Sequence, residues 1–276
     1  MANRYWVGNA TDAWENSGRW SATSGGAGGA SVPTKDDDVY IDANSFSTAG
    51  RAIQLNAACA CRKLFFSPDV LVYLDSRPGG YLKIEISAEF NALALTQYAV
   101  LYFTSELFYP GETKAITSLS AHPFLKIYQN YHPMSFLSDI SATDIYIQGS
   151  SIDFDENDVT FNSLTVSTTT SGFDATNSTI TIYDRLDIPE DNEACTFTGS
   201  TIILSSAILD APGQTFNNIE MSGLTQNIIK GSNAFNDIKL IPGKTLTVQA
   251  DTTQTITSLT GNGTKAQPIT LKSSSV

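Results

Sequence analysis

Apolar and polar residues alternate with a period of two along much of the chain. Examples are the segments Leu71–Leu74, Tyr81–Ile86, Ile180–Ile182 and Leu246–Val248. Successive side chains of a β-strand point to opposite faces, so this alternation is typical of strands with one buried face. No segment shows the 3.6-residue periodicity of a helix of useful length. The pattern therefore predicts an all-β protein.

One motif, Phe-Asn-x-Leu/Ile-x-apolar, recurs along the chain. It begins at Phe90, Phe161, Phe216 and Phe235, which are separated by 71, 55 and 19 residues. These separations lie near four, three and one times a unit of about 18–19 residues, a period within the range of solenoid coils. The repeat therefore predicts a right-handed parallel β-helix, a solenoid in which each coil stacks on the one before it.

The spacing inside the motif also predicts where the chain bends. The last two apolar residues are two apart and face inward together, whereas the Phe lies three residues before the first of them and is out of phase. Asn suits the bend between them, because it tolerates left-handed backbone and hydrogen-bonds to neighbouring amides. A β-sandwich is the alternative fold. It explains the alternation but not a motif that recurs near multiples of one period.

Composition narrows the classes of partner. Only 16% of the residues are charged, and the net charge is −12. Low charge suits stacked strands, since like charges placed one above another repel. Nucleic acids and anionic membranes both require basic patches, so neither is an expected partner. The N-terminus lacks the apolar core of a signal peptide, and we expect the thiols of Cys59, Cys61 and Cys195 to be reduced and buried.

The N-terminal part of the chain differs in composition from the rest and contains several motifs of its own. These are Tyr5-Trp6-Val7-Gly8, Trp14-Glu15-Asn16, Gly18-Arg19-Trp20-Ser21, the Gly-rich segment 24–33, Asp37–Asp42, and Asn56–Phe66 with its cysteines before a Leu-x-Phe strand. This block resembles the opening of bacteriophage and bacterial β-helix surface proteins, in which a Trp- and Gly-rich segment precedes the first coils. The resemblance covers residues 5–66 at the level of motif. It implies a fibre, spike or head appendage and carries no catalytic residues.

This change in composition also predicts that the chain is divided into two parts. We expect residues 1–50 to be a small Trp/Gly-rich docking or capping segment and residues 51–276 to be the parallel β-helix. Trp6, Trp14 and Trp20 are the candidate interaction residues, because large aromatic side chains anchor many protein contacts. The two other interpretations are that they pack together as the core of a cap or that they stack on sugar rings.

The densest acidic cluster offers a candidate metal site. Alternation places Asp153 and Asp155 on one face, and with Asn157 they form a candidate Ca²⁺ site. The segment does not fit an EF-hand loop, since its sixth position is Asp158 instead of Gly. A solvated turn is the simpler interpretation.

A second acidic cluster surrounds Pro189 and consists of Asp184, Asp187, Glu190 and Asp191. A glycan-degrading β-helix enzyme could hold its paired carboxylates here, although a loop between coils accounts for the same residues. No nucleophile elbow and no Cys/His arrangement of recognisable spacing is present. The sequence therefore predicts no catalytic residue and no cofactor.

Together these features predict a non-enzymatic structural or attachment component of a bacteriophage virion. The expected partners are other virion proteins, a host surface glycan and further copies of the chain, with a trimer favoured. Two alternatives stay open: a tailspike-type polysaccharide depolymerase, and an adhesin on the bacterial cell surface.

Overall fold

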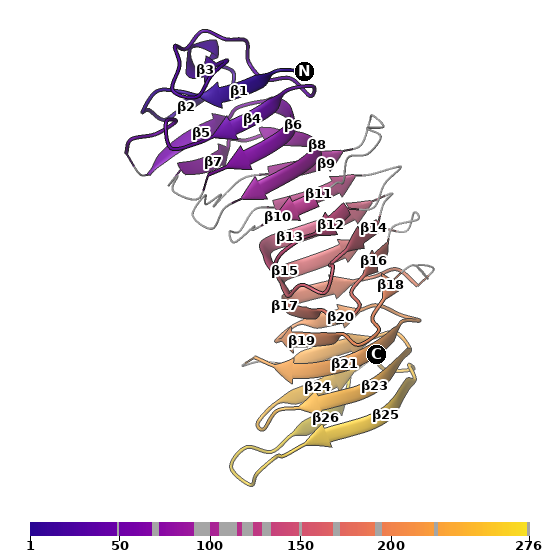
Figure 1. Ribbon diagram of the computed structural model, residues 1–276. Coiled ribbons are helices and arrows are strands. Elements are labelled where there is room, and N and C mark those ends of the chain that lie inside the picture. Colours follow the sequence, from indigo (N-terminus) through magenta and orange to yellow (C-terminus); the bar gives the residue numbers. More distant parts are fainter. Residues whose placement is uncertain are drawn as a thin grey trace. The chain divides into compact units, whose positions relative to one another are not determined.

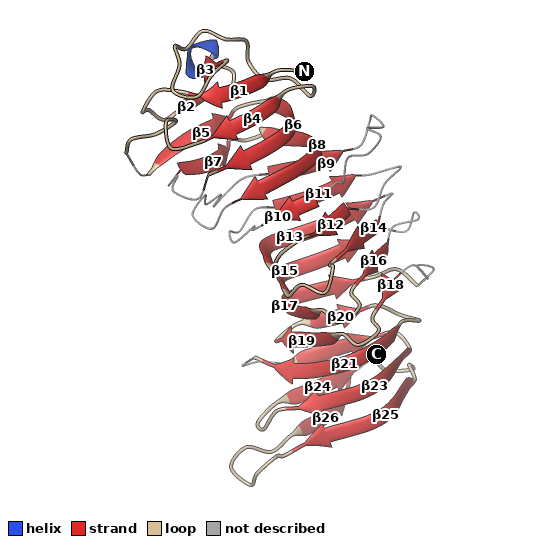
Figure 2. Ribbon diagram, viewed as in Figure 1, coloured by secondary structure: helices blue, strands red, loops and turns tan. Residues whose placement is uncertain are grey.

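The chain is nearly all β-strand and forms a β-solenoid of stacked parallel strands, which confirms the predicted fold class. This computed structural model describes residues 1–48, 50–67, 72–90, 100–104, 115–117, 124–128, 134–148, 151–167, 172–190, 195–223 and 226–274. The one helix among them is a single 3₁₀ turn, η1 (Ser17–Arg19) (Figures 1 and 2). Two compact units, residues 1–143 and 144–276, divide the chain, and each is described by itself.

The first unit contains the strands before the boundary at Thr143. They are β1 (Asn3–Trp6), β2 (Asp12–Ala13), β3 (Trp20–Ser21), β4 (Asp38–Ile41), β5 (Arg51–Leu55), β6 (Ala58–Phe66), β7 (Val72–Ser76), β8 (Tyr81–Phe90), β9 (Val100–Thr104), β10 (Ala115–Thr117), β11 (Phe124–Tyr128), β12 (Met134–Phe136) and the start of β13 (Ile140–Gln148).

Parallel pairing arranges most of the described strands of this unit in three columns. One column runs β1–β4–β6–β8–β10–β12. A second joins the first halves of β6 and β8 to β9 and β11. The third is β2–β5–β7. The long strands β6 and β8 belong to two columns, because the register shifts between Cys61 and Lys63.

The corner at this register shift is held by a buried ion pair. The guanidinium of Arg62 donates two hydrogen bonds to the carboxylate of Asp38, with the first, from Nε to Oδ1, 2.7 Å long. Both residues are buried. Asp38 lies on β4 and Arg62 on β6, so the pair ties the N-terminal segment to the strand stacked against it.

Residues 1–50, called the cap from here on, contain the strands β1 to β4 and the 3₁₀ turn η1. Strand β1 pairs in parallel with β4 and antiparallel with β3. Trp6, Trp14 and Trp20 are each at most 1% exposed and fill the inside of this cap. Trp20 contacts both other rings in edge-on geometry, with ring centroids 5.1 Å from Trp6 and 4.8 Å from Trp14.

The second unit contains the rest of β13 and the strands that follow. They are β14 (Ser151–Asp153), β15 (Val159–Val166), β16 (Gly172–Asp174), β17 (Thr179–Asp187), β18 (Cys195–Thr196), β19 (Thr201–Ser205), β20 (Ile208–Asp210), β21 (Thr215–Ser222), β22 (Asn227–Lys230), β23 (Asn233–Leu240), β24 (Thr245–Val248), β25 (Gln254–Gly261) and β26 (Thr270–Ser273).

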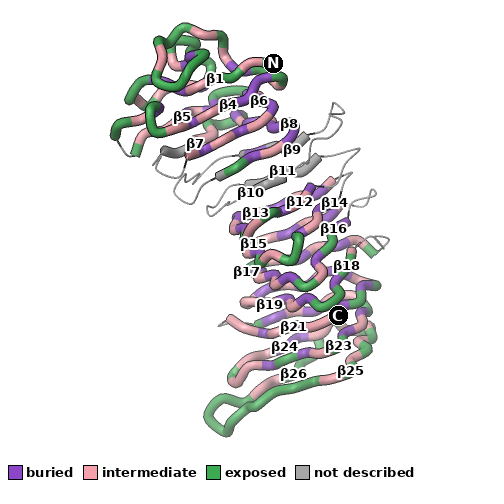
Figure 3. The backbone as a smooth tube through the Cα atoms, viewed as in Figure 1, coloured by how far each residue is buried: buried purple, intermediate pink, exposed green. Residues whose placement is uncertain are grey.

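Three parallel columns recur among these strands. The first is β15–β17–β19–β21–β23–β25. The second begins with the later halves of β15 and β17 and continues through β20, β22, β24 and β26. The third begins with β14, β16 and β18, and the contact between the rings of Phe197 and Phe216 places the paired first halves of β21, β23 and β25 next to them. Along most of these strands, buried residues alternate with half-buried or exposed ones (Figure 3).

The Phe-Asn motif marks the bend between columns, as its spacing predicts. The pairing of β15 with β17 shifts its register at Asn162. The pairing of β21 with β23 likewise leaves out Asn217 and Asn236. The proposed backbone reason is wrong, however, since none of these three residues has a positive φ. In the described part of this unit, the non-glycine residues with positive φ lie in other turns and are Asp155, Glu156, Asn177, Ser206 and Asp251.

Coil length is less regular than the motif suggests. Phe216 pairs with Phe235, so the predicted repeat that joins these two copies of the motif is confirmed. Phe161 instead pairs with Ile182, whose equivalents one and two coils later are Leu204 and Met221. The separation of Phe161 and Phe216 is therefore not three coils. The copy that begins at Phe90 extends into residues 91–95, which lie outside the described part of the chain.

Candidate functional site

A groove of about 450 Å³ runs across four neighbouring segments of the second unit. Each segment contributes an inward apolar residue between two outward residues. The four triplets are Thr196-Phe197-Thr198, Thr215-Phe216-Asn217, Ala234-Phe235-Asn236 and Thr255-Ile256-Thr257. Period-two alternation accounts for this pattern, because it sends the central side chain into the core and its two neighbours outward.

A ladder of phenylalanine rings lies beneath the groove. Phe154, Phe173, Phe197, Phe216 and Phe235 are each at most 3% exposed. Their successive ring centroids are 5.5, 5.0, 4.5 and 5.4 Å apart. These distances fall in the favourable range for aromatic pairs, so the ladder fixes the backbone that carries the groove walls.

Register aligns the outward side chains in columns. Thr215, Ala234 and Thr255 are direct partners on successive strands and form one column. Asn217 and Asn236 lie at the skipped register positions, on the other side of the inward residues. Consecutive members of a column are about 4.8 Å apart, the spacing of paired strands. Ala234 has only a methyl group between two threonines, so it leaves a notch in its column.

Among the described residues, the groove lining carries no charged side chain. Its walls present threonine hydroxyls and asparagine amides, which both donate and accept hydrogen bonds. Cys195 also contributes to the lining, and burial raises the pKa of its thiol to about 12. The thiolate is the nucleophilic form of cysteine, so this group is a neutral thiol near pH 7. The lining therefore offers hydrogen bonding without acid–base or nucleophilic chemistry.

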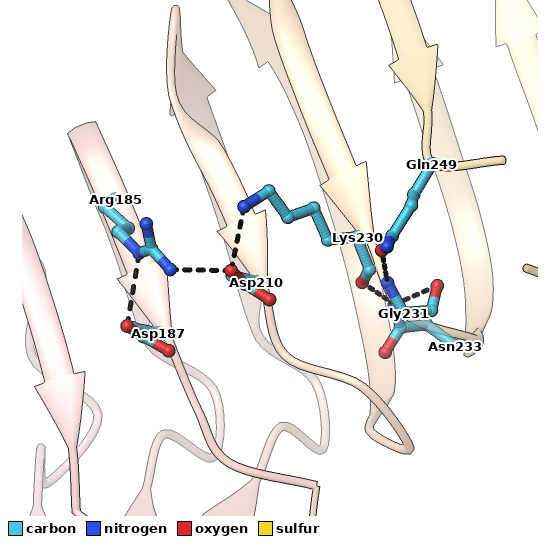
Figure 4. A network of polar contacts seen from close by, with 7 residues as sticks. All are labelled: Arg185, Asp187, Asp210, Lys230, Gly231, Asn233 and Gln249. Atoms are coloured by element: carbon cyan, nitrogen blue, oxygen red, sulfur yellow. Dashed lines mark hydrogen bonds and ion pairs between the residues drawn. The ribbon is translucent and has the colours of Figure 1, made fainter. Parts of the chain in front are cut away.

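The carboxylates of the Pro189 region follow a different column of the same unit. Asp187 pairs with Asp210 one coil later, and Asp210 pairs with Lys230. Arg185 contacts both carboxylates, with Nε 3.2 Å from Asp187 and Nη2 2.6 Å from Asp210. Lys230 Nζ is 3.1 Å from Asp210 (Figure 4). The two stacked carboxylates are thus compensated by two cations.

The other acidic residues of that region do not join this column. Asp184 is exposed, and its Oδ2 accepts a hydrogen bond from the hydroxyl of Ser163 at 3.1 Å. Glu190 is exposed at the following turn. Asp191 lies outside the described residues.

The candidate calcium residues lie in a tight turn. Asp153 Oδ1 accepts a hydrogen bond from the backbone amide of Asp155 at 2.8 Å. The side-chain amide of Asn157 donates to the carbonyl oxygens of Phe154 and Asp155. These polar atoms stabilise the turn, and no group of three His, Cys, Asp or Glu side chains suited to a metal ion occurs in the described part of the chain.

The three tryptophans suggested as interaction residues are inside the cap and present no ring at its surface. Trp20 Nε1 donates a hydrogen bond to the carbonyl oxygen of Trp14 at 2.7 Å, which fixes two of the rings relative to each other. Any docking by residues 1–50 would have to use other side chains. Among the described residues, no helix has the length and apolarity needed to cross a membrane.

The groove itself was not recognised from the sequence, although a signal for it exists. The triplets beginning at Thr196, Thr215, Ala234 and Thr255 share an apolar centre between small or polar flanks. These starting positions are almost evenly spaced along the sequence. A search for this shorter pattern, without the requirement for Phe-Asn, would have aligned all four.

Comparison of the chain with protein-family models, with curated proteins and with solved structures finds no match in any of the three. The function must therefore be argued from the fold and from the groove.

Proposed function

We propose that this chain is a non-enzymatic structural and attachment protein whose solenoid presents a binding surface to a glycan. The observation that carries the proposal is the groove of the second unit, whose described lining presents hydroxyl and amide groups and no charged side chain. Such a lining can hold a polar ligand but supplies no general acid, base or activated nucleophile.

We further propose that the protein is carried on a bacteriophage particle. This part of the proposal rests on the resemblance of residues 5–66 to phage and bacterial β-helix surface proteins. A low charged fraction and stacked parallel strands suit a surface protein, because stability along the stack grows coil by coil from contacts between neighbours.

The carboxylates Asp187 and Asp210 provide the alternative, a polysaccharide depolymerase. Glycosidases need two carboxyl groups, one of which acts as a general acid and must hold a proton. Arg185 forms an ion pair with each of these two carboxylates, and Lys230 forms a second one with Asp210, so both groups are already engaged by cations of the chain itself. This arrangement favours a structural ion-pair column over a catalytic pair.

The test combines attachment and hydrolysis in one preparation. Fluorescently labelled full-length protein should bind intact cells of the bacterium associated with the source of the gene. It should release no reducing ends from that bacterium's surface polysaccharide. Release that disappears in an Asp187→Asn, Asp210→Asn double variant would replace the attachment proposal with the enzyme. An antibody to the chain should also decorate purified phage particles, and an undecorated particle would refute the virion assignment.

A further inference from the structure

We infer that the groove over β18, β21, β23 and β25 binds an uncharged oligosaccharide that lies across successive coils. This inference rests on the attachment role proposed above and names the chemical class of its ligand. It is carried by the chemistry of the walls, by their repetition and by their rigidity.

The wall chemistry selects for a neutral, hydroxyl-rich ligand. Thr198, Thr255 and Thr257 are exposed and each offers a hydroxyl that can donate and accept a hydrogen bond. Asn217 and Asn236 add amide groups with the same double capacity. Sugar hydroxyls need both kinds of partner. An anionic ligand would meet no cation among the described residues of this groove, and the net charge of −12 would oppose its approach.

Repetition favours a linear polymer over a compact small molecule. Thr215, Ala234 and Thr255 occupy equivalent positions on three successive strands. An extended ligand would therefore meet wall residues at equivalent positions of each coil, about every 4.8 Å along the stack. Several weak hydrogen bonds on one chain act together, because each bond formed raises the effective concentration of the next group at its partner.

The walls are also ordered before any ligand arrives. Threonine is β-branched and has few rotamers on a strand, so little side-chain entropy is lost on binding. The buried rings of Phe197, Phe216 and Phe235 hold the strands from below. The methyl group of Ala234 leaves room at the centre of the groove, where a ligand can approach the strand closely.

The test uses the full-length protein and defined oligosaccharides. Maltoheptaose, cellohexaose, mannohexaose and N-acetylchitohexaose serve as neutral probes, and hexagalacturonate and a hyaluronan hexasaccharide serve as anionic probes. Calorimetric titration should detect binding of at least one neutral probe and of neither anionic probe. The Thr255→Val, Thr257→Val double variant keeps the shape of both residues but removes two hydroxyls, and it should weaken binding at least tenfold.

Two variants control for indirect effects. Thr181→Val changes a half-buried threonine on β17 outside the groove and should bind as the unchanged protein does. Ala234→Trp fills the notch and should abolish binding while the circular dichroism spectrum is retained. The inference is overturned if no neutral probe binds at millimolar concentration, if an anionic probe binds most tightly, or if the double valine variant binds normally. Cell attachment that persists in any of these cases would leave the attachment role standing with a different site.

Discussion

The phenylalanine ladder allows a graded test of how the second unit is stabilised. Phe216 is fully buried between two rings, with centroids 4.5 Å from Phe197 and 5.4 Å from Phe235. Phe235 contacts one ring among the described residues, and its partner on the next strand is Ile256. Substitution by leucine keeps most of the buried apolar volume but removes the ring pairs.

The expected magnitudes follow from the number of ring pairs lost. An aromatic pair contributes about 0.5–1.5 kcal/mol beyond the area that it buries. Phe216→Leu should therefore cost about 1–3 kcal/mol, and Phe235→Leu about half as much, since it loses one pair instead of two. Phe216→Ala should cost about 3–5 kcal/mol, because it also leaves a cavity.

Hydrogen exchange measured on peptides from β19 to β23 is the suitable assay, since it reports the opening free energy of individual coils. Thr215→Ala on the groove wall is the control and should change that free energy by less than about 0.5 kcal/mol. Two results would refute the reasoning: Phe216→Leu no more costly than Thr215→Ala, or Phe235→Leu more costly than Phe216→Leu.

Three further predictions concern the first unit. Arg62→Met should destabilise it by about 3–5 kcal/mol in chemical denaturation, because the carboxylate of Asp38 would stay buried without its partner. Gly80→Ala should cost about 3 kcal/mol or more in the same assay, since the added Cβ would lie 1.8 Å from the carbonyl oxygen of Leu55. Burial raises the pKa of Asp37, but hydrogen bonds outweigh it and leave the pKa below its ordinary value of 3.8. Asp37 therefore stabilises the fold above about pH 4, and this contribution is lost as the pH falls through the lowered pKa. In the Asp37→Asn variant, the free energy of unfolding should consequently decrease less steeply as the pH falls below about 4.

Matched controls separate these effects from general fragility. Lys239→Met removes an exposed partner of Glu220 and should leave the unfolding midpoint almost unchanged, in contrast to Arg62→Met. The Cβ added by Gly79→Ala meets no atom of the described residues within 4 Å, and the variant should cost only about 1–2 kcal/mol for its left-handed backbone. An Asp36→Asn variant alters an exposed neighbour of Asp37 and should keep the steep decrease of the unfolding free energy below about pH 4. Equal behaviour of a variant and its control would contradict the assigned cause.

The solenoid fold could be predicted from the sequence because its two signals are local. They are the alternation of apolar and polar residues and the repeat that joins Phe216 to Phe235. Phe216 and Phe235 lie one coil apart and flank the same kind of bend, so their equivalence could be read directly. Coil length varies, however: Ile202 pairs with Ile219, whereas Val248 pairs with Ser273. The assumption of one constant coil length therefore gave Phe161 a wrong position relative to Phe216.

The groove and the ion-pair column could not be derived in the same way. Phe173 and Phe197 belong to the ladder but are not followed by Asn, so a search built on that dipeptide passes over them. Contacts such as Asp210 with Arg185 join residues that are far apart in sequence. Their meeting depends on the exact number of residues in the intervening turns, which local patterns do not determine.

The column of Arg185, Asp187, Asp210 and Lys230 has a consequence for building new proteins from these coils. Asp210 receives a cation from the coil on either side, so its coil suits only neighbours that supply positive charge at that column. Exchanging the coil that carries Asp210 with the one that carries Lys230 would place Lys230 beside Arg185 and would separate Asp210 from Arg185. Coils of this protein are therefore not interchangeable modules. A chimera in which the coils are reordered would also need its charged residues in this column changed, so that cations and carboxylates still lie beside one another.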